Sequence, residues 1–288
     1  MPSSDFMRLR TLFLESRWGG MSLVSLYLSV VSGLVVALQY DPANPFYSAG
    51  VVELLAPFGR FWRSCHFYSS QLFFLFSLLH LAAIVLDRGD QKMASPKWLL
   101  LAGSVPASLL LLFTGYVLRG DATGEAAGVI AENITLAIPV IGKFLNSVLF
   151  AIEAEGMKRV YANHLIGLGV GWGICCWDHL RRYRVSPGQH SLLLAGLVLF
   201  SFLVAAPMEP ARLGVSHIQG PWFFLGLQEL LRHLDPLVAG VLIPATLLGA
   251  LLLAPREEKW RGRLWAFVLV WLTAYGGLTL VSVLRGMG

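Results

Sequence analysis

Residues 63–80 read RSCHFYSSQLFFLFSLLH, and residues 159–179 read RVYANHLIGLGVGWGICCWDH. Each apolar stretch carries two histidines, spaced 14 residues apart in the first and 15 in the second: His66 and His80, then His164 and His179. On a helix, 14 residues rise roughly 21 Å and end within about 40° of the starting direction, and 15 residues end within about 60°. Each stretch therefore predicts a helix with two imidazoles on broadly one face, near opposite sides of a bilayer core of roughly 30 Å.

The composition indicates an integral membrane protein. Hydrophobic residues make up 56% of the 288 residues and charged residues only 14%, with a mean hydropathy of +0.66. A soluble domain carries about a quarter charged residues. The net charge of +5 is modest, and Lys and Arg flank the apolar runs instead of forming a basic stripe, which argues against nucleic-acid binding. The N-terminal residues lack an apolar core with a cleavage site, so no removable signal is expected.

Seven stretches are apolar and long enough to be candidate membrane spans: 19–40, 61–86, 98–118, 160–180, 191–206, 237–253 and 264–284. Thirteen of the 22 Lys and Arg residues fall in segments on the same side of the membrane as the N-terminus, which predicts a cytoplasmic N-terminus and an outer C-terminus. Two outer segments, 119–157 and 207–236, contain apolar spacings that predict short surface helices. We expect an all-α membrane protein with a four-helix bundle and three further helices.

The four histidines are best interpreted as ligands of haem iron. A single histidine in an apolar helix is most often a hydrogen-bonded core residue, but polar residues inside a membrane are costly and tend to be functional. The two histidines of each helix lie too far apart to share one zinc ion, whereas two such helices can hold two haem irons. There is no C-x-x-C-H motif, so covalent attachment is not expected. The cysteines (Cys65, Cys175 and Cys176) are expected to be small buried hydrophobes.

Arginines and glycines near the histidines add support. Arg63 lies three residues before His66, and Arg159 lies five before His164. Either arginine suits a haem propionate, although ordinary snorkelling at the interface is the alternative. Gly19 and Gly33 repeat the spacing of 14 residues in the first span. A missing side chain at each level lets a flat macrocycle approach the backbone.

Further motifs occur in a fixed order along the chain. They are WGG and SG in the first span, RSCH at 63–66, GYVL at 115–118, AIPVIG at 137–142, R-x-Y-x-x-H at 159–164 and HIQGPWFFL at 217–225. With the histidine spacings, they make the chain resemble the cytochrome b family of quinol–cytochrome c reductases. The spacing of 15 and the seven spans resemble the short plastid-type cytochrome b (residues 1–186) fused to a subunit IV-like part (residues 187–288).

The resemblance implies cofactors and partners. His66 with His164 would ligate an outer, lower-potential b-type haem, and His80 with His179 an inner, higher-potential one. Electrons would come from menaquinol or ubiquinol and leave through a Rieske iron–sulfur protein and a c-type cytochrome, with protons released outside. The family also implies a homodimeric complex, here expected in the bacterial inner (cytoplasmic) membrane. Gly115, like Gly19 and Gly33, is expected to be a cofactor-binding residue. The outer quinol pocket is expected near these residues: Tyr116, Pro139, Pro221, Trp222 and Phe223.

Two departures from the family pattern concern this pocket. Pro221 stands where the family has a catalytic glutamate, and Arg119-Gly120-Asp121 stands where the family continues Pro-Trp. Proton abstraction from quinol needs a positioned base. Glu229, eight residues after Pro221, is the candidate substitute, and a surface helix charge is the alternative.

The missing glutamate keeps a second function open. The chain could be a non-bifurcating b-type membrane subunit of a quinol dehydrogenase that feeds a periplasmic multihaem cytochrome. A third class, a haem-free transporter or structural membrane protein, requires the histidine pairs to be accidental. His217, at the start of the pocket segment, is expected only to cap or to bridge by a hydrogen bond.

Overall fold

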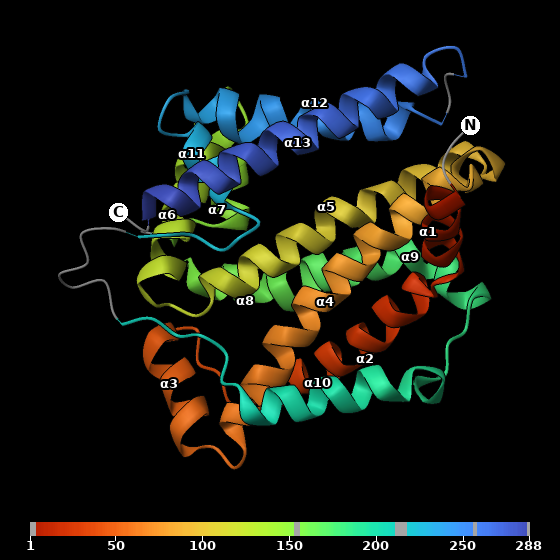
Figure 1. Cartoon of the computed structure of the whole chain (residues 1–288). Helices are drawn as coiled ribbons and strands as arrows, with labels where there is room; N and C mark the ends of the chain where they lie inside the picture. Colours follow the sequence, from red (N-terminus) through yellow and green to blue (C-terminus); the bar gives the residue numbers. More distant parts are fainter. Residues whose placement is uncertain (1–3, 153–155, 211–217, 256–257, 287–288) are drawn as a thin grey trace. The chain divides into compact units, whose positions relative to one another are not determined.

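The computed structural model describes residues 4–152, 156–210, 218–255 and 258–286, and all regular structure within them is helical (Figure 1). The prediction of an all-α protein is thereby confirmed. Helices occupy all seven predicted span positions: α2 (Trp18–Ala37), α4 (Gly59–Leu86), α5 (Ser95–Val117), α8 to α9 (Met157–Arg182), α10 (Ser191–Leu203), α12 (Ile243–Leu253) with the π-helical stretch before it (Val238–Leu242), and α13 (Arg261–Gly286). His217 lies outside the described residues.

Four of these helices are long and apolar enough to cross a membrane by themselves: α2, α4, α5 and α13. Met157–Arg182 and the following Pro187–Leu203 pass the same test as a pair bent by 95°. Val238–Leu253 is apolar but shorter. The chain is therefore an integral membrane protein. Its described residues hold four candidate spans, or five with the bent pair, and the count of seven remains a prediction.

Short helices lie before the first span and in the connecting segments. They are α1 (Ser4–Glu15), α3 (Pro45–Leu55), α6 (Ala122–Leu136), α7 (Gly142–Leu149) and α11 (Leu225–Leu230). The predicted pair of helices in 119–157 and the predicted helix in 207–236 are thus present. α6 ends at Leu136 and α7 begins at Gly142, so the segment that contains Pro139 separates the two helices.

The chain divides into two compact units. The first comprises Met1–Tyr40, Gly50–Leu112 and Trp172–Pro207, and the second comprises Asp41–Ala49, Phe113–Gly171 and Met208–Gly288. These units do not coincide with the predicted division of the chain between residues 186 and 187. That division was based on the family resemblance, and it remains a prediction.

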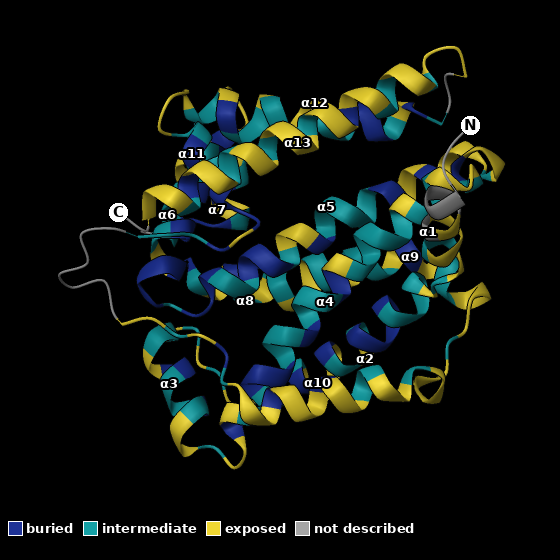
Figure 2. Ribbon diagram, in the orientation of Figure 1, coloured by how far each residue is buried: buried dark blue, intermediate teal, exposed yellow. Residues whose placement is uncertain are grey.

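Small polar residues bring α2 and α4 together in the first unit. The serines on one face of α2 are buried (Figure 2): Ser22, Ser25, Ser29 and Ser32. Ser22 Oγ lies 2.8 Å from Ser77 Oγ, and Ser29 Oγ lies 2.7 Å from Ser70 Oγ. Small side chains allow close backbone approach, and hydroxyl pairs supply attraction where apolar burial against lipid cannot. This face of α2 therefore fixes where the α4 histidines lie.

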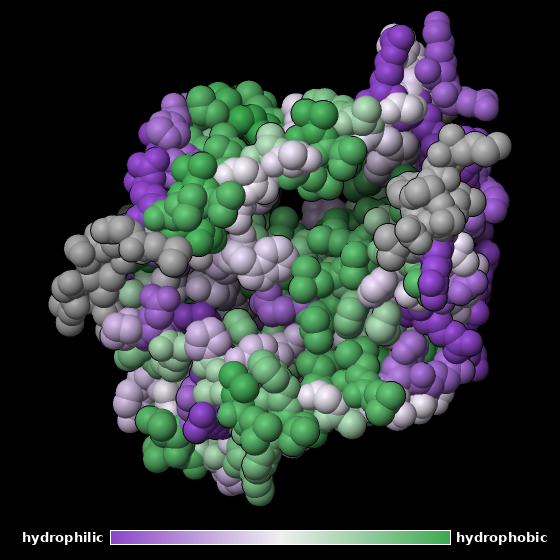
Figure 3. Space-filling model, viewed as in Figure 1, coloured by the Kyte–Doolittle hydropathy of each residue, from purple (hydrophilic) through white to green (hydrophobic). Residues whose placement is uncertain are grey.

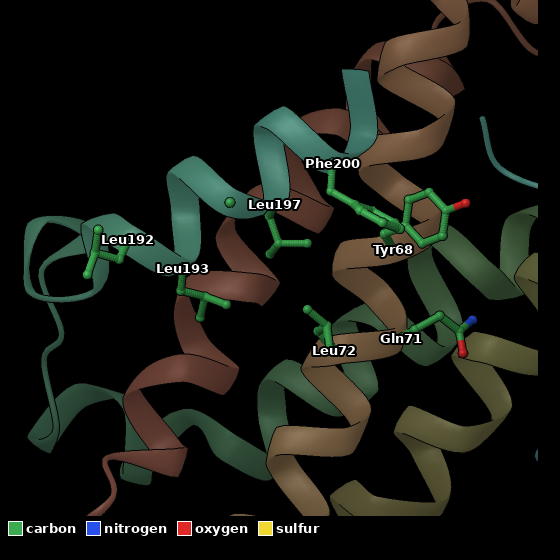
Figure 4. A pocket seen from close by; sticks show the side chains of 8 residues that line it. Tyr68, Gln71, Leu72, Leu192, Leu193, Leu197 and Phe200 are labelled. Atoms are coloured by element: carbon green, nitrogen blue, oxygen red, sulfur yellow. The ribbon is translucent and has the colours of Figure 1, made fainter. Parts of the chain in front are cut away.

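α10 packs on α4 in the same unit and leaves a groove of about 400 Å³ between them (Figure 4). α4 contributes Tyr68, Gln71 and Leu72, and α10 contributes mainly leucines and Phe200. Tyr68 Oη donates to Ala205 O at 2.9 Å and its ring contacts Phe200 edge-on at 4.8 Å. These contacts anchor the segment that follows α10 against the start of α4.

In the second unit, α11 packs against α13 through a glycine. A Cβ on Gly226 would lie 2.7 Å from the Tyr275 ring. Tyr275 Oη donates to Phe223 O at 2.7 Å and accepts from Leu227 N at 3.3 Å. Tyr275 on α13 therefore helps to hold the turn that carries Phe223.

The long helices expose apolar side chains. On α13, Leu269 and Val270 are each 67% exposed, and hydrophobic residues predominate on the surface of α12 and α13 seen in Figure 3. A surface this apolar belongs in lipid.

Candidate haem-binding site

His80 on α4 and His179 on α9 face one another within the first unit. Their ring centroids lie 6.0 Å apart at an interplanar angle of 49°. Two imidazoles that bind one metal ion from opposite sides, each with a metal–nitrogen distance of about 2 Å, have ring centres about 6 Å apart. The side chains at this level therefore fit a bis-histidine haem.

Glycines on α2 lie directly behind the α4 histidines. A Cβ on Gly19 would lie 3.0 Å from His80 Cε1, and one on Gly33 would lie 2.8 Å from His66 Cε1 and Nδ1. Real Cβ atoms scarcely make such contacts, so each ring occupies the space that any other residue would need. The shared spacing of 14 on both helices thus has a steric cause: each glycine accommodates an imidazole.

Hydrogen bonds orient the other two imidazoles. His66 Nδ1 lies 2.8 Å from Ser29 O, so a proton on Nδ1 is donated to that carbonyl and Nε2 keeps its lone pair. His164 Nδ1 lies 2.9 Å from Thr114 Oγ1, and a Cβ on Gly115 would lie 3.1 Å from His164 Cε1. Such bonds to the far ring nitrogen orient ligand histidines in metal sites generally.

His164 lies in a π-helical stretch, Asn163–Leu168, between α8 and α9. Short π-helical segments frequently occur at functional sites. His66 belongs to the first compact unit and His164 to the second. Their joint ligation of an outer haem therefore remains a prediction.

The two arginines differ in their surroundings. Arg63 is buried, forms an ion pair with Glu53, and donates to Ala206 O at 2.5 Å and Pro207 O at 3.4 Å. Arg159 is exposed on α8. Arg63 thus has protein acceptors that its sequence position did not reveal, and its proposed role toward a propionate remains a prediction.

The residues expected around the quinol pocket lie mostly in one aromatic cluster of the second unit. The Tyr116 and Phe223 rings meet edge-on at 6.4 Å, and Trp222 meets Phe223 edge-on at 5.5 Å. Pro221 is buried, Trp222 is 45% exposed, and Pro139 is exposed. The structure therefore joins Tyr116 to the 221–223 turn, as a pocket wall requires, while Pro139 makes no described contact with either.

Glu229 is among the most deeply buried side chains, with 2% exposure. Its Oε1 accepts from Arg285 Nη2 at 2.8 Å and lies 3.3 Å from His233 Nε2, and its Oε2 lies 3.4 Å from Arg232 Nε. The carboxylate therefore points toward α13, on the same side of α11 as Gly226. A surface helix charge, the alternative considered for Glu229, does not describe this environment.

Comparisons with known proteins agree with this geometry. The family model described as cytochrome b/b6/petB matches residues 9–179. The cytochrome b6 of Heliobacterium mobile is 28% identical over 153 residues, covering 51% of this chain and 72% of the relative. That of Synechococcus sp. (strain JA-3-3Ab) is 31% identical over 153 residues, covering 51% and 70%. The chain belongs to the cytochrome b family.

A solved structure shares the fold of this cytochrome b. It is described as a hyperthermophilic respiratory Complex III, with a TM-score of 0.72 and 18% identity over 92% of this chain and 83% of that chain. That match covers 92% of this chain, so the likeness of fold extends past residue 179, where the family model ends. As a family member, the chain is a redox subunit of the quinol–cytochrome c reductase type, and b-type haems and quinone binding are typical of the family.

In the Arg119-Gly120-Asp121 segment, which departs from the family pattern, Arg119 and Asp121 form a buried ion pair. Asp121 is completely buried and caps α6 by accepting from Gly124 N at 2.9 Å; it also accepts from Arg119 Nε at 2.8 Å and from Glu209 N at 3.0 Å. The Arg119 guanidinium lies 4.3 Å from the centroid of the Tyr116 ring. The sequence signal was present, since Asp before an apolar helix is a strong capping residue, but the pairing with Arg119 was missed.

Proposed function

We propose that this cytochrome b holds two b-type haems and passes electrons from quinol across the membrane. The facing His80 and His179 rings, 6.0 Å apart in a family member, carry the proposal. His66 and His164 would hold the second haem at the outer level, each oriented through Nδ1. When bound, the haems supply one-electron transfer; the protein positions them and excludes competing reactions.

Quinol oxidation on the outer side would release protons there and so couple electron transfer to proton translocation. The aromatic cluster of Tyr116, Trp222 and Phe223 would form a wall of the quinol pocket, because flat apolar surfaces with few polar groups suit a quinone ring. The partners would be a Rieske iron–sulfur protein and a c-type cytochrome in a homodimeric complex of the bacterial cytoplasmic membrane. The N-terminus would be cytoplasmic, and menaquinone or ubiquinone would be the substrate.

Glu229 is the proposed proton acceptor in place of the glutamate replaced by Pro221. It follows the pocket turn by six residues, is buried, and is held by Arg285 and Arg232. The proton would be accepted by Oε2, which has no hydrogen-bond partner among the described residues, once quinol lies within reach of it. In Glu229→Gln we expect quinol oxidation to fall on the order of 100-fold, with unchanged haem spectra.

Glu125→Gln is the matched control for Glu229→Gln, because it removes an exposed carboxylate from α6 of the same unit. A Glu229→Gln protein with normal turnover and a lowered melting temperature would assign Glu229 to packing between α11 and α13 instead.

The decisive experiment is purification of the complex from its native membrane. Redox titration of the b-type absorption should resolve two components, and a Rieske protein should co-purify. A single component, or none, would contradict the two-haem proposal.

The presence of Pro221 favours one alternative function: a non-bifurcating subunit of a quinol dehydrogenase that feeds a periplasmic multihaem cytochrome. A multihaem cytochrome that co-purifies in the absence of a Rieske protein would establish this alternative.

A further inference from the structure

A single histidine connects the buried Glu229 carboxylate to the surface of the second unit. The side chain of Glu229 is 2% exposed, whereas that of His233 is 63% exposed. Glu229 Oε1 lies 3.3 Å from His233 Nε2, within hydrogen-bonding reach. The two residues are four apart, at the end of α11 and in the turn that follows it, so their side chains lie on one face. A buried carboxylate is thus bonded to an imidazole that reaches the surface.

The two arginines at this carboxylate cannot carry a proton away. Arg285 of α13 donates to Oε1 at 2.8 Å, and Arg232 Nε lies 3.4 Å from Oε2. A guanidinium stays protonated in proteins, so neither arginine can accept a proton and pass it on. An imidazole can do both, since it changes charge between about pH 5 and 8. Among the described side chains that contact the Glu229 carboxylate, His233 is therefore the one able to relay a proton.

The sequence around His233 indicates contact with water and not with lipid. Arg232 precedes it directly, and Asp235 follows two residues later. Charged side chains are rare where a chain meets the lipid interior, so a segment with this many of them belongs at the aqueous boundary. The charged groups near the ring are Glu229, Arg232 and Asp235 of its own segment and Arg285 of α13. A proton on the exposed ring can thus exchange directly with solvent.

We propose that His233 relays the proton of quinol from Glu229 to the surrounding water. The inference rests on the proposed function, because it requires quinol oxidation with Glu229 as the proton acceptor. It goes further by assigning the exit of the proton. A buried base must lose its proton before it can act again, and the exposed imidazole on Oε1 supplies the route.

The relay moves one proton and no electrons. Glu229 Oε2 takes the proton from a quinol hydroxyl group, and a half-turn of the carboxyl group about its Cγ–Cδ bond places the O–H against His233 Nε2. In the tautomer protonated at Nδ1, Nε2 is free to accept this proton, and the carboxylate is restored. The imidazolium then loses its Nδ1 proton to water, and exchange with solvent returns the ring to its first tautomer.

The test is the pH dependence of quinol oxidation by the purified complex, measured with a short-chain quinol. The relay needs a neutral His233 ring, so turnover should fall as the pH is lowered from about 8 to 5. The amide of His233→Gln can still bond to Glu229 but cannot take its proton. In this variant we expect turnover to fall by as much as in Glu229→Gln, on the order of 100-fold. The acid fall should disappear, and the haem spectra should not change.

Two further measurements separate proton transfer from structure. In His233→Gly, free imidazole in the buffer should restore turnover, because the vacated position lies at the surface. A defect of packing would not respond to imidazole. His190→Gln is the control, because it removes an imidazole from the first unit. It should keep both the turnover and the acid fall of the unaltered complex.

The outcomes distinguish the relay from the proposed function. If Glu229→Gln is slow while His233→Gln keeps normal turnover and the acid fall, the relay is wrong and the proposed function stands. If His233→Gly retains both b-type components and imidazole does not restore its turnover, the relay is also wrong. If Glu229→Gln turns over normally, or the unaltered complex oxidises no quinol, the proposed function fails and the relay with it. Where no His233 variant assembles, the unaltered complex decides, since turnover that is constant from about pH 8 to 5 overturns the relay.

Discussion

The ring of His66 occupies the space where Gly33 would carry a side chain, since a Cβ there would lie 2.8 Å from both Cε1 and Nδ1. The ring cannot simply rotate away, because Nδ1 is bonded to Ser29 O. We therefore expect Gly33→Val to lose the haem at His66 and keep the other, as measured by haem content and reduced-minus-oxidised spectra. Gly103→Ala is the control, because no neighbouring atom lies within 4 Å of a Cβ there. Equal haem loss in both variants would refute the steric explanation.

Substitution of a histidine in the inner pair, His80 and His179, is expected to remove the other b-type component of the spectrum. In His179→Ala, His80 loses the ring that lies 6.0 Å away, so the b-type component assigned to this level should disappear while the other persists. His190→Gln alters another imidazole of the first unit and should leave both components. If His179→Ala retains both components at full amplitude, His179 is not a ligand.

The Arg119–Asp121 pair predicts a large effect on stability. Asp121→Ala leaves the Arg119 guanidinium buried without its main partner and removes the cap of α6. Breaking a buried pair from one side costs about 3–5 kcal/mol, and a lost cap about 1 kcal/mol more. The apparent melting temperature in detergent should fall by many degrees.

Asp178→Asn is the control for the stability prediction. Asp178 is half exposed in its pairs with Arg181 and Arg182, and exposed pairs contribute at most about 1 kcal/mol. A similar fall in both variants would show that burial of the Arg119–Asp121 pair is not the cause.

Glu209 predicts a dependence of stability on pH. Partial burial, followed by the nearby Asp121 carboxylate, raises the pKa of Glu209 above its ordinary value of 4.5, and Arg119 opposes the shift. A raised pKa in the folded state means that the protonated form is favoured there. The associated stability is therefore fully present below about pH 4.5 and is lost as the pH rises through the raised pKa.

We accordingly expect Glu209→Gln to match the unaltered protein in melting temperature near pH 4 and to exceed it at pH 7. Melting curves across this range, recorded in one detergent, measure the difference. A difference that grows toward low pH would have the wrong sign and would reject the assignment.

Helix positions and histidine spacing were predictable from the sequence because both depend on local geometry. A helix repeats every 3.6 residues, so a spacing of 14 places His66 and His80 on one face whatever surrounds them. The apolar composition of each span is likewise a property of the local chain. The pairing of His80 with His179 was implied only by the family resemblance, and the tertiary structure was needed to show that the two rings face one another.

The hydrogen-bond and ion-pair partners of the site residues were not predictable in the same way. Arg63 bonds to carbonyl groups 143 and 144 residues away, and His164 to a threonine 50 residues away. From the sequence, Glu229 could equally be a charge on a surface helix. The tertiary structure places Arg285 of α13 against its carboxylate.

The sequence by itself thus determined a membrane protein with paired histidines at two levels, because hydropathy and helical period are properties of the local chain. Only the tertiary structure decided which glycine backs each imidazole and which carboxylate neutralises each buried arginine. Those choices depend on contacts between helices that are distant in sequence. Only these contacts determine which group compensates a buried charge and which side chain fills the space beside a glycine.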